Sequence, residues 1–167
     1  MNDDNPSTSK STHEFSCELA VDEEPGESTG DITGPLLNTW WPSASNTLPE
    51  IWTAEKDGCD INIAVILTGR SRIHSLNRDY RGKDRPTDVL TFDLSDSPDE
   101  TEGEIYISIP VAREQADHAG VSLEEELSRL LIHGLLHLAG HDHHTPAEGR
   151  KMAAATRRWI PVMWPEN

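Results

Sequence analysis

The alternation of apolar and polar residues in the middle of the chain predicts three short strands. Residues 61–68 are rich in β-branched side chains and lie between turn-forming residues, which is typical of a buried strand. A second strand is expected over 88–92, and a third over 104–109, where isoleucines at every second position share one face. The folded core is therefore expected to begin near Ile61.

Apolar residues at helical spacing predict two helices beside these strands. The first spans 70–80, and the second, a short one, spans 111–118. Gly82 and Gly120 follow these two segments, and glycine readily adopts the left-handed conformation in which many helices end. The ends of both helices are therefore marked in the sequence.

Capping boxes mark the start of two further helices. A Ser-x-x-Glu box at Ser122 precedes a strong stripe of leucines, so a long helix is expected from there to Gly140. A Thr-Pro-x-Glu box at Thr145 predicts a last helix that runs to about Trp159. The order strand-helix-strand-strand-helix-helix-helix indicates a small mixed sheet packed by helices.

The beginning of the chain has a different pattern. Residues 1–35 are rich in Ser, Thr, Asp, Glu, Pro and Gly and have no sustained apolar period. We therefore expect them to form a disordered acidic segment, with the domain occupying residues 36–167. Within that domain the aromatic segment 36–52 has two interpretations: its side chains pack onto the domain, or they form a surface for a partner.

Charge is unevenly distributed along the chain. The net charge is −16, and nine acidic residues against one basic residue place −8 of it within residues 1–35. Conversely, six of the fourteen basic residues lie between Arg70 and Arg85. The total charge argues against a polyanionic partner, but this one stretch is basic.

Targeting and redox features predict a cytoplasmic protein. No segment approaches the roughly 20 apolar residues of a membrane span. The acidic, polar start lacks the cationic and apolar parts of a secretory signal. Cys17 and Cys59 are too few for a disulfide framework and lack the spacing of a metal site, so both are expected to be free thiols.

Five of the eight histidines fall within residues 133–144, and three of them have the spacing of a zinc site. His133 and His137 are four residues apart on the long predicted helix, so their imidazoles leave one face about 6 Å apart along its axis. Gly140 permits a reversal that returns His143 as the third ligand, in the H-x3-H-x5-H spacing of metzincin-like zinc sites. Three protein ligands leave a fourth position for water, as in catalytic zinc sites.

The neighbours of this cluster have alternative roles. His141 and His144 are expected to face solvent or to support the ligands from outside the coordination sphere. Asp142 either orients a ligand imidazole or binds backbone N–H groups in the turn. Gly134 occupies the position of the general-base glutamate of zinc peptidases, which disfavours peptide hydrolysis, although a remote carboxylate such as Glu104 could replace that base.

Residues 133–143, HGLLHLAGHDH, resemble the HGxLHLxGyDH signature of the YbeY family, the bacterial endoribonucleases and rRNA maturation factors. The resemblance extends through residues 76–92, LNRDYRGKDRPTDVLTF, and through 103–107, GEIYI. Altogether it covers about 60–160 of the chain, and no function of the family passes to the residues before it.

The resemblance implies an α+β fold: a small mixed four-stranded sheet packed by helices, with a metzincin-like zinc helix. It implies one Zn²⁺ per chain with Arg81 facing the substrate, and the zinc ligands that it implies are His133, His137 and His143. One departure bears on these ligands, because His141 stands where the family usually has Tyr and is therefore an alternative to His143.

The activity that the resemblance implies is zinc-dependent endonucleolytic cleavage of single-stranded RNA, in maturation of the 16S rRNA 3′ end and in ribosome quality control. Its partners are then single-stranded RNA, ribosomal RNA or the small ribosomal subunit, and neither DNA nor a membrane. Two alternatives are a ribosome-assembly RNA-binding protein with a structural zinc, and a zinc hydrolase of another substrate such as a peptide. A fourth protein ligand would favour the binding protein.

The basic stretch suits a phosphodiester substrate. A guanidinium offers a bidentate fork for two phosphate oxygens, which makes Arg81 a candidate catalytic clamp. The alternative for Arg81 is a surface ion pair with Asp79 or Asp84. The residues expected to bind the flanking phosphates of the RNA are Arg78, Lys83 and Arg85. Asn77 either bonds the neighbouring loop or faces the cleft.

Overall fold

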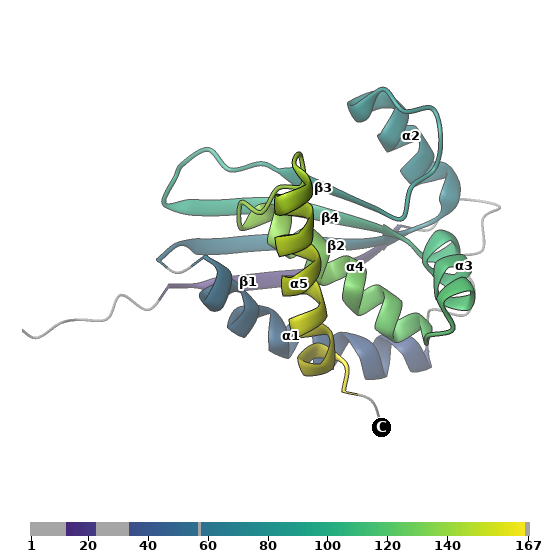
Figure 1. Ribbon diagram of the computed structural model, residues 1–167, viewed down its shortest axis with the longest axis horizontal. Coiled ribbons are helices and arrows are strands. Elements are labelled where there is room, and N and C mark those ends of the chain that lie inside the picture. The colour runs from purple at the N-terminus through teal and green to yellow at the C-terminus, as the bar shows by residue number, and fades with distance from the viewer. Residues whose placement is uncertain (1–12, 23–33, 57, 166–167) are drawn as a thin grey trace, which may run out of the picture.

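The computed structural model describes residues 13–22, 34–56 and 58–165. Four strands form one sheet (Figure 1), and they are β1 (Phe15–Asp22), β2 (Asp60–Thr68), β3 (Val89–Asp93) and β4 (Glu100–Ser108). Their order in the sheet is β1-β2-β4-β3. The β1–β2 and β2–β4 pairs are parallel and the β3–β4 pair is antiparallel, so the sheet is mixed.

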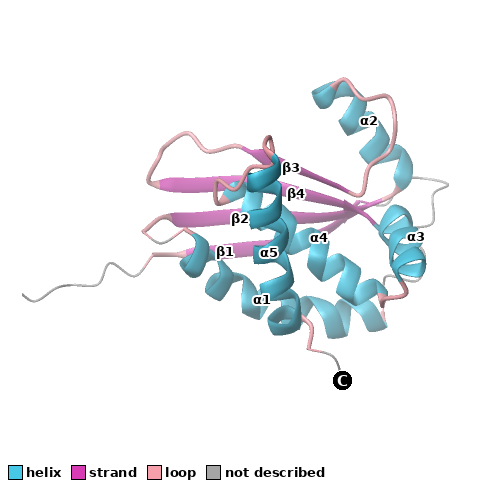
Figure 2. Cartoon of the chain, viewed as in Figure 1, coloured by secondary structure: helices cyan, strands magenta, loops and turns pink. Residues whose placement is uncertain are grey.

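Five helices accompany the sheet in the described part of the chain, and they are α1 (Pro35–Glu55), α2 (Arg70–Arg81), α3 (Ile109–Ala119), α4 (Leu123–Leu138) and α5 (Pro146–Met163). Among the described residues, no helix is both long and apolar enough to span a membrane. Figure 2 shows α1, α4 and α5 on the same side of the sheet, where the large apolar core lies. Helix α2 packs over a smaller cluster of buried residues, Ile73, Leu76 and Leu90.

Two glycines allow helix α4 to pack closely against the sheet. A Cβ atom on Gly134 would lie 2.7 Å from Cγ2 of Ile105 in β4. A Cβ atom on Gly103 in β4 would lie 2.7 Å from Cδ2 of Leu138. These separations are shorter than any normal carbon–carbon contact, so the two glycines fix the height of α4 above the sheet.

The predicted fold class, α+β with a small mixed four-stranded sheet packed by helices, is confirmed. The predicted helix ends are also observed. Gly82 and Gly120 have φ values of 66° and 70° and cap α2 and α3 in the left-handed conformation. The side chain of Ser122 caps α4, and Thr145 forms a complete capping box with Glu148 at the start of α5.

Two element boundaries differ from the prediction by more than two residues. The strand expected over 104–109 starts earlier and ends at Ser108, because Ile109 and Pro110 open α3, and proline fits the first turn of a helix. The last helix continues beyond Trp159 to Met163, although it contains Pro161. Both differences lie at the ends of elements whose type was predicted correctly.

The prediction of disorder for residues 1–35 is wrong for Phe15–Asp22, which form β1. The apolar residues of this strand alternate toward the core, and they are Phe15, Cys17, Leu19 and Val21. Parallel pairing with β2 along the full strand satisfies the backbone, so the acidic surroundings do not prevent folding. The domain therefore includes β1 in addition to residues after 35, while residues 1–12 and 23–33 lie outside the described residues.

The aromatic segment 36–52 packs onto the domain as part of α1, which decides between its two interpretations. Trp40 is fully buried, and its Nε1 donates a hydrogen bond to Oγ of Ser128 in α4 at 3.0 Å. Nε1 of Trp52 donates to the carbonyl oxygen of Cys59 at 3.1 Å. The folded core thus begins well before Ile61, contrary to the prediction.

Candidate metal centre

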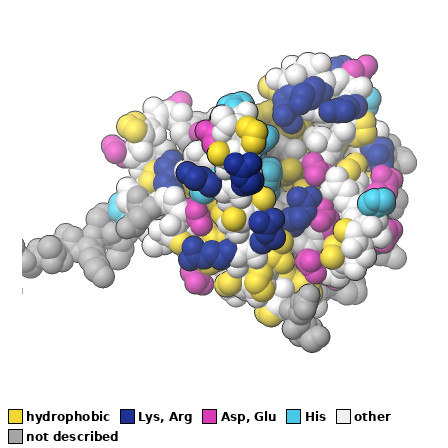
Figure 3. Space-filling view, in the orientation of Figure 1, with side chains coloured by type: hydrophobic (Ala, Val, Ile, Leu, Met, Phe, Trp, Pro, Cys, Tyr) yellow, Lys and Arg dark blue, Asp and Glu magenta, His cyan; other side chains and the backbone are white. Residues whose placement is uncertain are grey.

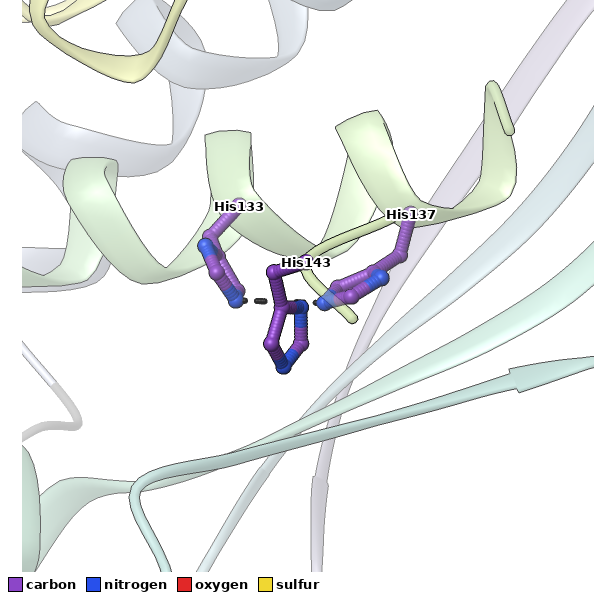
Figure 4. Close-up of side chains that lie close together, drawn as sticks. All are labelled: His133, His137 and His143. Atoms are coloured by element: carbon purple, nitrogen blue, oxygen red, sulfur yellow. Dashed lines mark hydrogen bonds between the residues drawn. The ribbon is translucent and has the colours of Figure 1, made fainter. Parts of the chain in front are cut away.

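Three histidines meet beside α4 (Figure 4). His133 and His137 project from successive turns of this helix, and their Nε2 atoms lie 3.2 Å apart. His143 comes from the loop that follows the helix and points its ring at the other two. One nitrogen from each ring lies within 4.8 Å of the others, so the three side chains can hold one metal ion.

The loop after α4 reverses direction within a few residues. Gly140 has a φ of 93°, a conformation that favours glycine. The N–H of His141 donates to the carbonyl oxygen of Leu136 at 2.9 Å, which closes the end of the helix. Oδ1 of Asp142 accepts a hydrogen bond from the N–H of His143 at 2.7 Å. Asp142 therefore binds backbone in the turn, one of the two roles expected for it.

The same loop is tied to two other helices through Glu55 at the end of α1. Its Oε2 lies 2.9 Å from Nε2 of His141, and its Oε1 accepts a hydrogen bond from Nε1 of Trp159 in α5 at 2.8 Å. His144 is 85% exposed and pairs with Asp142 at 2.9 Å. Neither His141 nor His144 belongs to the three-histidine cluster.

The electrostatics of the cluster favour neutral imidazoles. Burial, together with the neighbouring His137 and Arg129, lowers the pKa of His133 to about 4. Burial and the adjacent His143 also lower the pKa of His137. Imidazole binds metals in its neutral form, so the cluster presents free lone pairs at neutral pH.

The cluster forms one wall of an open cavity of about 360 Å³. The opposite wall consists of Arg81 at the end of α2 and of residues 87–91, which lead into β3. Arg81 makes no ion pair with any residue that the structure describes. The two carboxylates expected as its partners are paired elsewhere, Asp79 with Arg78 and Asp84 with His74. The predicted clamp and the three predicted ligands therefore border one space.

The other predicted basic residues lie outside this cavity. Arg78 is on the exposed side of α2, with its Nε 2.8 Å from Oδ1 of Asp79. Lys83 and Arg85 are exposed in the loop after α2. Asn77 is buried and donates from Nδ2 to the carbonyl oxygen of Arg85 at 2.7 Å, so it bonds the neighbouring loop.

Two residues near the metal centre were not predicted from the sequence. Arg129 lies one turn before His133 on α4, and its guanidinium pairs with Glu126 and approaches Asp88 to 3.6 Å. The i, i+4 spacing of Arg129 and His133 was a signal for this position. Glu55 had no such signal, because it reaches the centre through contacts between residues far apart in the chain.

The fold and the cluster define an α+β protein with a three-histidine cluster that could hold a metal ion. A family model described as Endoribonuclease YbeY matches residues 38–162 of the chain. The chain belongs to this family, as its resemblance in sequence had indicated.

Individual relatives support the same membership. An Endoribonuclease YbeY of Brevibacillus brevis is 47% identical over 106 residues, which cover 54% of this chain and 67% of the relative. The one of Desulfitobacterium hafniense is 43% identical over 141 residues, which cover 78% and 85%. Among solved structures, the solution structure of the Thermotoga maritima protein TM1509 matches with a TM-score of 0.60 and 30% identity, and covers 89% of each chain.

Proposed function

We propose that this protein is a zinc-dependent endoribonuclease that cleaves single-stranded RNA, in maturation of the 16S rRNA 3′ end and in ribosome quality control. The observation that carries the proposal is that Arg81 and the three-histidine cluster line one open cavity. The relatives named Endoribonuclease YbeY point to RNA as the substrate class. The composition argument for a cytoplasmic location agrees with this role and stays a prediction.

Zinc suits this donor set, since catalytic zinc sites are commonly built from three protein ligands such as histidines. Three imidazole nitrogens and no carboxylate make up the cluster, a set that disfavours magnesium, calcium and manganese. When bound, zinc supplies a Lewis acid that activates water and polarises a phosphoryl oxygen. We propose one Zn²⁺ per chain, held by His133, His137 and His143.

The protein's own residues provide positioning and charge. We assign Arg81 to the phosphate, because its guanidinium borders the cavity without an ion-pair partner among the described residues. The two carboxylates at the cavity, Asp88 and Asp142, already accept hydrogen bonds from backbone N–H groups. We assign contacts to more distant phosphates to the three exposed basic residues Arg78, Lys83 and Arg85.

Two observations weigh against the alternatives. A structural zinc needs a fourth protein ligand, but the nearest candidates, His141 and His144, are paired with Glu55 and Asp142. A peptidase needs a general base near the metal, but position 134 faces Ile105. Glu104, the remote substitute, neighbours Phe92 across the sheet and does not line the cavity.

The test is cleavage of a labelled RNA that carries a single-stranded and a duplex segment. We expect the purified protein to cut within the single-stranded segment, to lose activity with a chelator and to recover it with zinc. His137→Ala should be inactive, and His118→Ala is the matched control because His118 is exposed on α3 and belongs neither to the cluster nor to the lining of the cavity. A protein that carries one zinc per chain and binds this RNA without cutting it would favour the non-catalytic alternative.

A further inference from the structure

The three-histidine cluster borders a second hollow in addition to the cavity of Arg81. This hollow measures about 390 Å³ and lies between α4 and α5. His133 and His143 line both spaces, so the two adjoin at the cluster, one beside α5 and the other beside the residues that lead into β3. The volume lies within the range of about 300–1,000 Å³ that is usual for small-molecule pockets.

We propose that this second hollow binds the nucleotide next to the cleaved phosphate, on the side of the RNA strand away from Arg81. The inference rests on the proposed function and deepens it. An endonuclease cuts within a strand, so it must accommodate RNA on both sides of the bond that breaks. A site with a single recess would hold only one of those sides.

The lining of the hollow suits a nucleobase. Met152 and Thr156 are buried at its floor, and Ala153 and Ile160 contribute further apolar surface from the same face of α5. Gly149, one turn before Ala153, brings the backbone of α5 close to His143. A base has two apolar faces and needs such a surface when it leaves the stack of its neighbours.

The rim of the hollow suits a phosphate. Arg157 is exposed there, and it makes no ion pair with any described residue. Arg129, on the other rim, is held by both oxygens of Glu126, so its charge is largely compensated and its position fixed. Among the residues that the structure describes, Arg157 is therefore the cation of this hollow without an ion-pair partner, as Arg81 is of the cavity.

The distribution of charge favours this path for a polyanion. Figure 3 shows Lys and Arg side chains over α2 and over α5, on the face that also presents histidine side chains between them. The face of the sheet that points away from the large apolar core carries negative charge. On this face Glu18 and Glu104 flank Ala64 on neighbouring strands, and Glu102 lies beside Asn62. A single strand of RNA is thus attracted to the side of the molecule with both recesses.

The test compares Arg157→Ala with Arg150→Ala, which removes the same charge from an exposed position of α5 outside both recesses. Each variant is assayed on single-stranded RNAs that extend on both sides of the cleavage site, and on RNAs truncated at that site from either end. We expect Arg157→Ala to lower kcat/KM about tenfold on the extended RNA, with Arg150→Ala unchanged. The salt dependence of RNA binding should also weaken by about 0.7 in logarithmic slope for Arg157→Ala.

Truncation provides the decisive comparison. On the RNA that lacks the nucleotides expected to bind in the hollow, Arg157→Ala should have the same kcat/KM as the wild type. Ala153→Phe, which fills the hollow, should show the same dependence on RNA length. The inference is overturned if the wild type cleaves RNA while both variants retain its rates on every RNA, or lose activity equally on all of them. A wild type that binds zinc and cleaves no RNA would instead overturn the proposed function itself.

Discussion

Gly134 lies directly against Ile105, so that a methyl group on Gly134 would lie 2.7 Å from Cγ2 of Ile105 and 3.1 Å from Oγ1 of Thr91. This contact sets the distance between the histidine helix α4 and strands β3 and β4. It also explains why the residue after His133 is glycine, since any side chain there would push the helix away from the sheet. The metal cluster and the wall of the cavity are therefore positioned by the same contact.

Replacing Gly134 by alanine should destabilise the protein by about 1–3 kcal/mol, the usual cost of overpacking a tight core. Gly149→Ala is the matched control, because a methyl group there meets only Cβ of His143 at 3.9 Å. The control should stabilise α5 by about 0.5–1 kcal/mol through helix propensity. Urea unfolding of the metal-free proteins measures both effects, and equal stability of the two variants would refute the packing argument.

Removing the carboxylate of Glu55 should weaken metal binding without touching a ligand. Glu55→Ala leaves Nε1 of Trp159 and the ring of His141 without their partner, and so loosens the loop that carries His143. We expect the affinity for zinc to fall about tenfold, as measured by competition with a chromophoric chelator. Glu50→Ala, at an exposed position of α1, should retain the wild-type affinity. An unchanged affinity in both variants would mean that Glu55 does not position the loop.

The stability of the metal-free protein should depend on pH through His133. Its pKa in the folded protein is about 4, whereas an imidazole in the unfolded chain titrates near about 6.5. Between these values the unfolded chain binds more protons, so the free energy of unfolding rises with pH. The contribution is complete above about pH 6.5 and is lost as the pH falls toward 4.

Chemical denaturation from pH 7 down to pH 4.5 measures this dependence in the presence of a chelator. His133→Asn should flatten part of the slope, because the variant removes the group that titrates differently in the two states. The same replacement at His144, which is 85% exposed, serves as the control for removal of a histidine side chain. Equal slopes for the wild type and His133→Asn would show that burial does not lower the pKa of His133.

Much of the fold was readable from local patterns. The glycines that cap α2 and α3, and the box at Thr145, act within a few residues, so their signals are complete in the sequence. Helix α1 was missed because Pro42 and Pro49 interrupt its pattern, and its stability comes from burial of its apolar side against the rest of the core.

Strand β1 and the surroundings of the metal centre show where sequence reasoning ends. The alternation over Phe15–Asp22 was present, but the acidic composition on either side obscured it. The three histidines were found because helical spacing brings two of them together. The contact of Glu55 with His141, across 86 positions of sequence, depends on tertiary packing and has no local signature.

The central claim is that Arg81 and the three histidines act on one RNA substrate, and the rate of single-stranded RNA cleavage by Arg81→Ala tests it most directly. We expect a loss of at least about 100-fold with one zinc per chain retained, an intermediate rate for Arg81→Lys, and nearly full activity for Arg150→Ala. Arg150 is the matched control because it is an exposed arginine of α5 that lies outside the cavity. Wild-type cleavage by Arg81→Ala, with zinc bound, would contradict the account.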